Sequence, residues 1–389
     1  MIPYGRHHID KEDIKSVVKV LKGNNLTQGP LISAFEKKIS KYVGSKYSVA
    51  VTSCTAGLHL ASIVSGIKKG KTLLTSPITF ASTANSSLFC GGETVFADID
   101  NSTINLSVSN IKKIISKKKI HAISPVHFSG LACDVKGIKK IADKIGAAIY
   151  EDAAHAFGAS YPDGTKVGSC KYSDMTIFSF HPVKSISTGE GGIITTNNKK
   201  IYEKLLRLRN HGFEKNKNNF ISKKNSHTNE KINPWYYEMQ ELGYNYRITD
   251  IQCALGLSQL KKIDKFINKR RKIAKYYDSA FVNLKNCKPV QKDMRDLSSN
   301  HLYILRINFK KLKKTRAELM NQFKKIGIIT QVHYIPVINH PYFNKKKYKI
   351  NSFPNSLDYY NSALSIPIFY DLTNKQQLYI IDKVKKLIG

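Results

Sequence analysis

Short apolar runs alternate with longer stretches of helical periodicity over the first two thirds of the chain. Several runs are apolar at successive positions, which is typical of strands covered on both faces. The runs that predict strands span residues 47–51, 72–76, 94–99, 122–128, 147–152, 175–180 and 191–196. Helical spacing of apolar residues lies between them, for example over 138–146 and after Ser53. This β-α-β-α order predicts an α/β fold with a mainly parallel sheet.

The flanking segments predict how the chain is divided. Apolar positions from Ile14 to Leu21 follow helical spacing and predict a helix. Asp10 and Asp13 precede them and predict a capping box at its start. A long helical stretch over 249–285 connects the large domain to a smaller α+β domain. We place the large domain at residues 10–250 and the small domain at 251–389, with residues 1–9 packing near the latter. The polar, Lys/Asn-rich residues 213–235 predict a long surface loop.

Charge changes this picture little. The 389 residues include 63 Lys and Arg against 28 Asp and Glu, a formal net charge of +35. Such an excess favours a polyanion partner, and a basic nucleic-acid-binding protein stays open as an alternative. The basic residues are scattered, however, in short runs such as 117–119, 223–224, 313–314 and 345–347. We therefore predict a solvated basic surface and no nucleic-acid partner.

Cysteine usage and hydropathy indicate the compartment. The six cysteines form no CxxC pair and have no clustered histidine partners, so no metal site is predicted and reduced thiols are expected. The first residues lack an apolar core of a signal peptide, and no run of about 18 apolar residues occurs. We expect a cytoplasmic protein without a membrane partner.

The most informative segment for chemistry is FSFHPVKSISTGEGG at 178–192. Lys184 follows a predicted strand and precedes a glycine-rich turn, and open α/β sheets bind ligands at such strand ends. A lysine in this position can form a Schiff base with a carbonyl cofactor. Most lysines are solvated surface residues, and that alternative applies to Lys184 taken alone.

Other strand ends supply the remaining parts of a pyridoxal phosphate site. Asp152 ends the strand of EDAAH, where a carboxylate can keep a pyridine nitrogen protonated, although it could equally cap a turn. SCTAGL at 53–58 is a strand-to-helix turn whose N–H groups and Thr55 can hold a phosphate. Phe80 in SPITFAS can stack on an aromatic ring or belong to the core. The combination predicts a site for this cofactor.

Five segments together resemble the sugar aminotransferases of the DegT/DnrJ/EryC1/StrS family. They read SCTAGL, SPITFASTAN, EDAAHAFGA, FSFHPVKSISTGEGG and ELGYNYRITDIQCALGLSQL. The resemblance implies an aspartate-aminotransferase-like fold (PLP fold type I) and pyridoxal 5'-phosphate (PLP) as cofactor. It also implies a homodimer with shared active sites. Some members are dehydratases with a histidine where Lys184 stands, so the lysine indicates transamination.

The resemblance assigns roles to particular positions. Lys184 would bind the cofactor and move the proton, Asp152 would pair with the ring nitrogen, and His155 would lie near the phenolic oxygen. The other implied cofactor contacts are Phe80 on the ring, Thr55, Ala56 and Ser179 at the phosphate, and Asn245 reaching the phosphate from the other subunit. The implied substrate contacts are Tyr4, Asn25, Leu26, Thr27, Cys54, His333 and Tyr334.

Within the family, four segments are most similar to members that act in pseudaminic acid biosynthesis. They read IPYGRHHIDKEDI, LTQGP, PWYYEMQELGYNYR and QVHYIPV. Such members move an amino group from L-glutamate to C4 of a UDP-linked 4-keto-6-deoxy-N-acetylhexosamine. Another nucleotide 4-keto sugar, for example a dTDP-linked one, stays open because it would need only altered pocket contacts.

Overall fold

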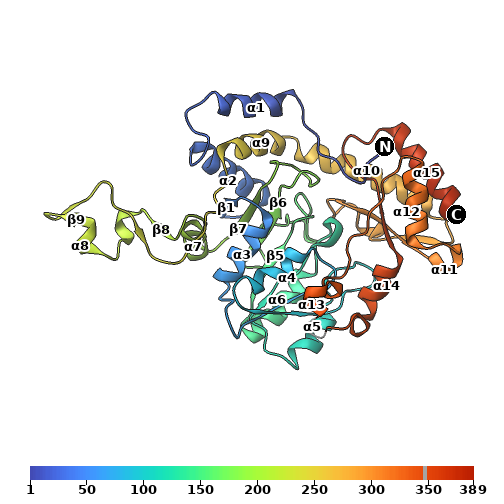
Figure 1. Cartoon of the computed structure of the whole chain (residues 1–389), viewed down its shortest axis with the longest axis horizontal. Helices are drawn as coiled ribbons and strands as arrows, with labels where there is room; N and C mark the ends of the chain where they lie inside the picture. The colour runs from blue at the N-terminus through green and yellow to red at the C-terminus, as the bar shows by residue number, and fades with distance from the viewer. Residues whose placement is uncertain (345–347) are drawn as a thin grey trace.

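The computed structural model describes residues 1–344 and 348–389, so the lysine run at 345–347 lies outside the described residues. A seven-stranded sheet forms the centre of the large domain (Figure 1). Its spatial order is β1 (Tyr47–Val51), β7 (Gly192–Thr196), β6 (Met175–Ser179), β5 (Ala148–Asp152), β4 (Ala122–Ile123), β2 (Thr72–Thr75) and β3 (Glu93–Phe96). Strand β7 is antiparallel to both of its neighbours, and the other pairs are parallel. The predicted α/β fold with a mainly parallel sheet is confirmed.

One predicted strand is much shorter than its apolar run. The run over 122–128 pairs as a ladder only at Ala122 and Ile123, and beyond them Val126 makes an isolated bridge to Asp152. Pro125 has no N–H to donate, and proline interrupts a ladder in the middle of a sheet. The chain then enters a 3₁₀ turn at Phe128–Gly130.

Helices cover both faces of the sheet. Along β6, Ile177 packs in one buried cluster with Leu58, whereas Phe178 packs in another with Phe35. Successive residues of a strand point to opposite faces of the sheet, so both faces of this sheet are buried at β6. The covering helices are α2 (Pro30–Val43), α3 (Cys54–Val64), α4 (Ala81–Leu88), α5 (Val108–Ile115), α6 (Val135–Ile145) and α7 (Lys199–Arg209).

The capping signals at the start of the chain act as predicted. Helix α1 (Lys11–Leu21) begins after Asp10, which accepts the N–H of Asp13, and the Asp13 carboxylate accepts the N–H of Asp10 in return. Helix α2 ends at Gly44, whose positive φ of 81° lets the chain leave the helix. Both helices pack against α9 (Asp250–Leu260).

The helical stretch over 249–285 is two helices, α9 and α10 (Ile263–Phe281). The first part of α10 places Phe266 in the large-domain core, while Tyr277 lies in a second core with Tyr303. The second core is built on the antiparallel strands β12 (Cys287–Pro289), β13 (Tyr303–Ile307) and β14 (Ala363–Ile366). The helices α11 (Phe309–Leu312), α12 (Arg316–Lys325) and α15 (Asn374–Ile388) contribute to this core. Helices α13 (Pro341–Asn344) and α14 (Pro354–Ser362) instead place Phe343 and Tyr359 in clusters that include large-domain residues.

Residues 213–239 form an arm that projects from the large domain (Figure 1). Its base is closed by β8 (Phe213–Glu214) pairing with β11 (Glu238–Met239). Farther out lie α8 (Lys223–Ser226), β9 (His227–Thr228) and β10 (Lys231–Ile232). The arm exposes Ile221 and Trp235, which are 76% and 72% accessible. Among the residues that the structure describes, no helix has the length and apolar character to cross a membrane.

Candidate active site

A cavity of about 420 Å³ lies where β5 and β6 end and α3 and α4 begin. It brings together most of the residues that the sequence singles out. These are Tyr4, Cys54, Thr55, Phe80, Asp152, His155, Ser179, Lys184, His333 and Tyr334. Segments from both ends of the chain therefore meet at the carboxyl ends of two strands, where ligands bind in open α/β sheets.

Five predicted residues do not line this cavity. Ala56 is buried in the first turn of α3, and its N–H donates to Ser53 Oγ (3.1 Å). The turn at 25–27 lies by the start of α9, because Asp250 N–H donates to Leu26 O (3.0 Å). Asn245 is exposed and pairs with Asn210 in an isolated bridge.

Lys184 is carried on a short loop between β6 and β7. The loop is closed at its base by two hydrogen bonds, Phe180 N–H to Gly191 O and Thr188 N–H to Phe180 O, both 2.9 Å. Burial lowers the pKa of Lys184 to about 8, although Cys54 and Asp152 act in the opposite direction. A fraction of the amine is therefore uncharged at neutral pH, which suits a nucleophile.

Asp152 is 4% exposed at the end of β5. Its Oδ2 accepts the Thr83 hydroxyl (2.5 Å) and its Oδ1 accepts the Ala154 N–H (3.0 Å). The carboxylate thus caps the following turn and also lines the cavity. A buried carboxylate held by two donors is fixed in direction and stays available to a cationic ring nitrogen.

The amino terminus of α3 offers unused donors. Ser53 caps the helix, but no residue in the described part of the chain accepts the N–H groups of Cys54 and Thr55 or binds the Thr55 hydroxyl. Strand β7 lies very close, because a Cβ at Gly192 would stand 2.6 Å from Cys54 N. Free N–H groups at a helix amino terminus attract phosphate.

His155 and Tyr334 form a directed pair in the cavity wall. Ser129 N–H donates to His155 Nδ1 (3.3 Å), so the imidazole proton resides on Nε2 and donates to Tyr334 Oη (2.8 Å). The phenolic hydrogen of Tyr334 is then free for another acceptor. Burial raises the pKa of Tyr334 and Asp152 adds to this effect, so the phenol stays neutral.

Among the further residues that line the cavity, three have titratable side chains and are not predicted from the sequence: His181, Glu190 and His301. His181 and Glu190 lie within FSFHPVKSISTGEGG, so the motif itself was the available signal. His301 precedes the apolar run LYILRI, and only a strand is predictable there. No local pattern indicates that this histidine reaches the strand ends of the other domain.

These groups fit pyridoxal phosphate. An amine of lowered pKa, a buried fixed carboxylate and free helix N–H groups all face one cavity. They match an aldehyde, a basic ring nitrogen and a phosphate. Fold and site together define the class of PLP-dependent transferases of fold type I.

The comparisons identify the family. The model of the DegT/DnrJ/EryC1/StrS aminotransferase family matches residues 7–385, and the chain belongs to this family. It is a PLP-dependent sugar aminotransferase.

Relatives match over nearly the whole chain. The spore coat polysaccharide biosynthesis protein SpsC of Bacillus subtilis is 38% identical, with 100% of this chain and 97% of SpsC covered. The UDP-4-amino-4,6-dideoxy-N-acetyl-beta-L-altrosamine transaminase of Campylobacter jejuni is 36% identical, with 99% of each chain covered. The solved structure of Helicobacter pylori PseC, an aminotransferase of pseudaminic acid biosynthesis, is 30% identical with a TM-score of 0.88, covering 100% and 99% of the two chains.

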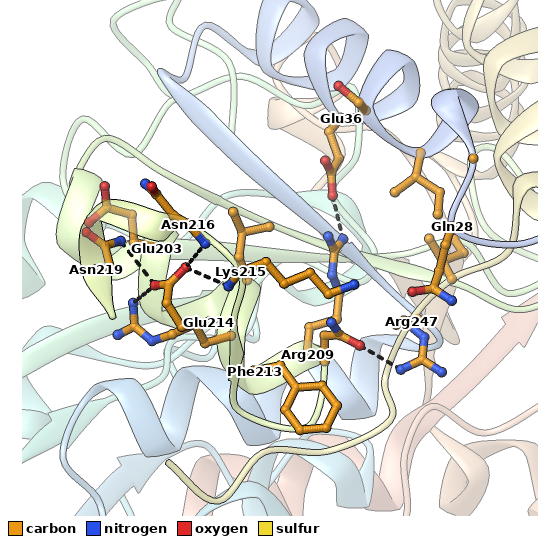
Figure 2. Close-up of a pocket in the computed structure, with 17 residues that line it drawn as sticks. Gln28, Glu36, Glu203, Arg209, Phe213, Glu214, Lys215, Asn216, Asn219 and Arg247 are labelled. Atoms are coloured by element: carbon orange, nitrogen blue, oxygen red, sulfur yellow. Dashed lines mark hydrogen bonds and ion pairs between the residues drawn. The ribbon is translucent and has the colours of Figure 1, made fainter. Parts of the chain in front are cut away.

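A second cavity of about 460 Å³ lies at the base of the arm (Figure 2). Arg209 and Arg247 enter it from two segments; Arg209 pairs with Glu36 (2.6 Å), whereas Arg247 donates to Asn210 (2.7 Å). Gln28, next to the predicted turn at 25–27, lies on the same wall. The turn at 25–27 and Asn245, which pairs with Asn210, are therefore neighbours of this second cavity, whereas Ala56 is not.

The pKa of Lys184 predicts how PLP-free enzyme responds to pH. Only the uncharged amine attacks an aldehyde, so the rate of PLP capture should rise about tenfold per pH unit below pH 8. Above pH 8 the rate should level off. Stopped-flow absorbance with PLP measures this profile, and a rate that climbs steadily to pH 10 would contradict the assigned environment.

Proposed function

We propose that the protein transfers the amino group of L-glutamate to C4 of UDP-2-acetamido-2,6-dideoxy-beta-L-arabino-hexos-4-ulose, a UDP-linked 4-keto-6-deoxy-N-acetylhexosamine, in pseudaminic acid biosynthesis. The Lys184 cavity carries the proposal, since its donor set suits PLP-dependent transamination. The full-length similarity to the Campylobacter transaminase and to Helicobacter PseC supports this sugar.

In this proposal, each residue has a task that its surroundings permit. When bound, PLP supplies an electrophilic carbon and a ring that accepts the electrons of a broken C–H bond. Lys184 would accept the proton from that bond and return it to the carbon on the other side of the transferred nitrogen, which a pKa near 8 allows. Asp152 keeps the ring nitrogen protonated. The N–H of Thr55, with Ser179, holds the phosphate, and Phe80 packs on the ring.

The substrate contacts come from the rim of the cavity. Tyr4 and His333 lie against one another, with ring centroids 5.3 Å apart, and the hydroxyl hydrogen of Tyr334 in the cavity wall is not used by His155. We assign these groups and Cys54 to the sugar. A neutral phenol donor suits a carbonyl or hydroxyl oxygen of the sugar.

A second candidate is the same chemistry on another nucleotide 4-keto sugar, because the chain is as similar to SpsC, named for spore coat polysaccharide biosynthesis, as to the Campylobacter transaminase. Purified protein would be incubated with glutamate and a panel of UDP- and dTDP-linked 4-keto sugars, and NMR would give the configuration of each amino sugar. Conversion of the UDP-linked N-acetyl sugar alone supports the proposed substrate. Conversion of other sugars alone favours the second candidate, and no conversion of any sugar contradicts both candidate substrates.

We also propose a homodimer in which each subunit completes the other's site. Asn245 is exposed in the single chain, and the turn at 25–27 lies beside the second cavity rather than the Lys184 cavity. Two-fold symmetry would bring both segments to the Lys184 cavity of the partner.

Subunit mixing tests this arrangement. Lys184→Ala removes the amine, and Asn245→Asp places a carboxylate at the phosphate of the site to which Asn245 contributes. Each variant alone should be inactive. Co-expression should restore about a quarter of wild-type activity, since half of the dimers are hybrids with one intact site. Absence of recovery in hybrids isolated by two affinity tags would mean that Lys184 and Asn245 of one subunit serve the same site, and full activity of Asn245→Asp alone would show that Asn245 has no role.

A further inference from the structure

His301 lies in the wall of the Lys184 cavity and has no part in the chemistry proposed above. It is 5% exposed and lies two residues before β13, in a segment that returns from the second core to the strand ends. Its ring lies against that of His155, with centroids 4.4 Å apart. The ring is therefore placed between the cavity and a buried wall of the large domain.

The imidazole of His301 makes no hydrogen bond with any residue in the described part of the chain, and its Nδ1 is a buried atom without a partner. A neutral imidazole has one donor and one acceptor nitrogen. A proton on Nδ1 would leave a buried donor unsatisfied, which is costlier than leaving a lone pair unsatisfied. The proton therefore belongs on Nε2.

The surroundings keep this ring neutral and fixed. Its backbone N–H donates to Ser129 O (2.9 Å), and its carbonyl accepts Arg270 Nη1 (3.3 Å). Burial lowers the pKa of His301 well below its usual value, and Lys184, His155, Arg270 and His333 lower it further. The Nε2–H donor thus persists through the neutral pH range.

Each of the neighbouring histidines already has a hydrogen-bond partner at its ring. Both nitrogens of His155 are engaged, Nδ1 by Ser129 N–H and Nε2 by Tyr334 Oη. His333 pairs through Nδ1 with Ser365 Oγ (2.9 Å). Of these three buried rings, as far as the described residues show, His301 is the one with no hydrogen bond at either ring nitrogen.

We propose that His301 donates a hydrogen bond from Nε2 to an oxygen of the molecule bound in the Lys184 cavity. The oxygen belongs to the cofactor or to the substrate held on it, and in both cases it is a carbonyl, phenolate or carboxylate acceptor. The inference rests on the proposed function for the substrate case and on the PLP dependence of the family for the cofactor case.

Three substitutions distinguish this role from packing. His301→Gln keeps an N–H near the position of Nε2, His301→Asn keeps one near Nδ1, and His301→Phe keeps a flat ring against His155 without any donor. PLP affinity is measured by absorbance titration of the PLP-free enzyme. Binding of the amino donor is measured from the absorbance change on adding L-glutamate, and binding of the nucleotide is measured as the affinity for UDP. Thermal melting shows that each variant is folded.

Loss of the bond should cost about tenfold in affinity or KM. The expected pattern is near wild-type behaviour for His301→Gln and a tenfold loss for His301→Asn and His301→Phe. A loss in PLP affinity makes the cofactor the acceptor, and a loss confined to glutamate or UDP makes the substrate the acceptor. Equal behaviour of the Gln and Phe variants, unchanged or impaired alike, would overturn the proposal. Wild-type enzyme that binds PLP but ignores glutamate would contradict the proposed function, while the PLP arm would still test His301.

Discussion

Replacement of Lys184 by alanine is expected to lower turnover by roughly 10³-fold or more, because the same amine binds the cofactor and carries the proton. The protein should still fold, since Lys184 makes no hydrogen bond or ion pair through its side chain with any described residue and lies on a loop closed by backbone bonds. The visible absorption of covalently bound PLP should vanish. Borohydride reduction followed by peptide mass spectrometry should label the wild-type peptide at Lys184 and leave the variant unlabelled.

A matched control is Lys375→Ala, which removes an exposed lysine in the first turn of α15. It changes the charge by the same amount and should retain full activity and the absorption band. Normal transamination by Lys184→Ala would remove the central assignment, and label on another lysine would show which amine replaces it.

Replacement of Asp152 by asparagine should lower turnover by roughly 10²- to 10³-fold, while PLP remains bound through the amino terminus of α3. An amide of similar shape can still accept the Ala154 N–H, but it has no negative charge to hold the ring nitrogen protonated. The rate loss should therefore appear in kcat, with a smaller change in PLP affinity. PLP methylated at the ring nitrogen is permanently cationic and should restore part of the rate.

Thr83→Val separates charge from geometry. It removes the hydroxyl that donates to Asp152 Oδ2 (2.5 Å) and leaves the carboxylate in place. One lost hydrogen bond should cost about tenfold or less. If Thr83→Val and Asp152→Asn were equally impaired, and methylated PLP rescued neither, the role of Asp152 would be orientation of the turn rather than charge.

The large domain could be predicted well because its signals are local. Apolar runs give β1, β5, β6 and β7 within one or two residues, and Asp10 with Asp13 gives the start of α1. The cavity residues at strand ends follow from the same pattern, since topology brings such ends to one edge of the sheet. The strand predicted over 122–128 is longer than β4, because hydrophobicity carries no information about the missing N–H of Pro125.

Contacts between distant segments could not be derived in this way. His301 reaches the cavity because Ser129 O accepts its N–H, and Ser129 has a positive φ of 60° that no local pattern announces. The second cavity at the arm combines residues from α2, α7 and the segment after the arm. Such sites depend on packing between elements, which hydrophobic periodicity alone does not specify.

The loop that carries Lys184 is held at its base by backbone hydrogen bonds, which limits the parts of the active site that can change conformation. Because residues 180–191 leave and re-enter adjacent strands through paired backbone hydrogen bonds, we expect the backbone of this loop to keep its conformation when a ligand enters. We expect ligands to enter the cavity past its other walls, at Tyr4 and at His333 with Tyr334. Hydrogen–deuterium exchange should therefore be slow at 180–191 with or without ligand and become ligand-dependent at residues 1–8 and 330–336. We therefore expect the segment that carries the reacting amine to stay fixed while the segments at residues 1–8 and 330–336 adjust to admit the ligand.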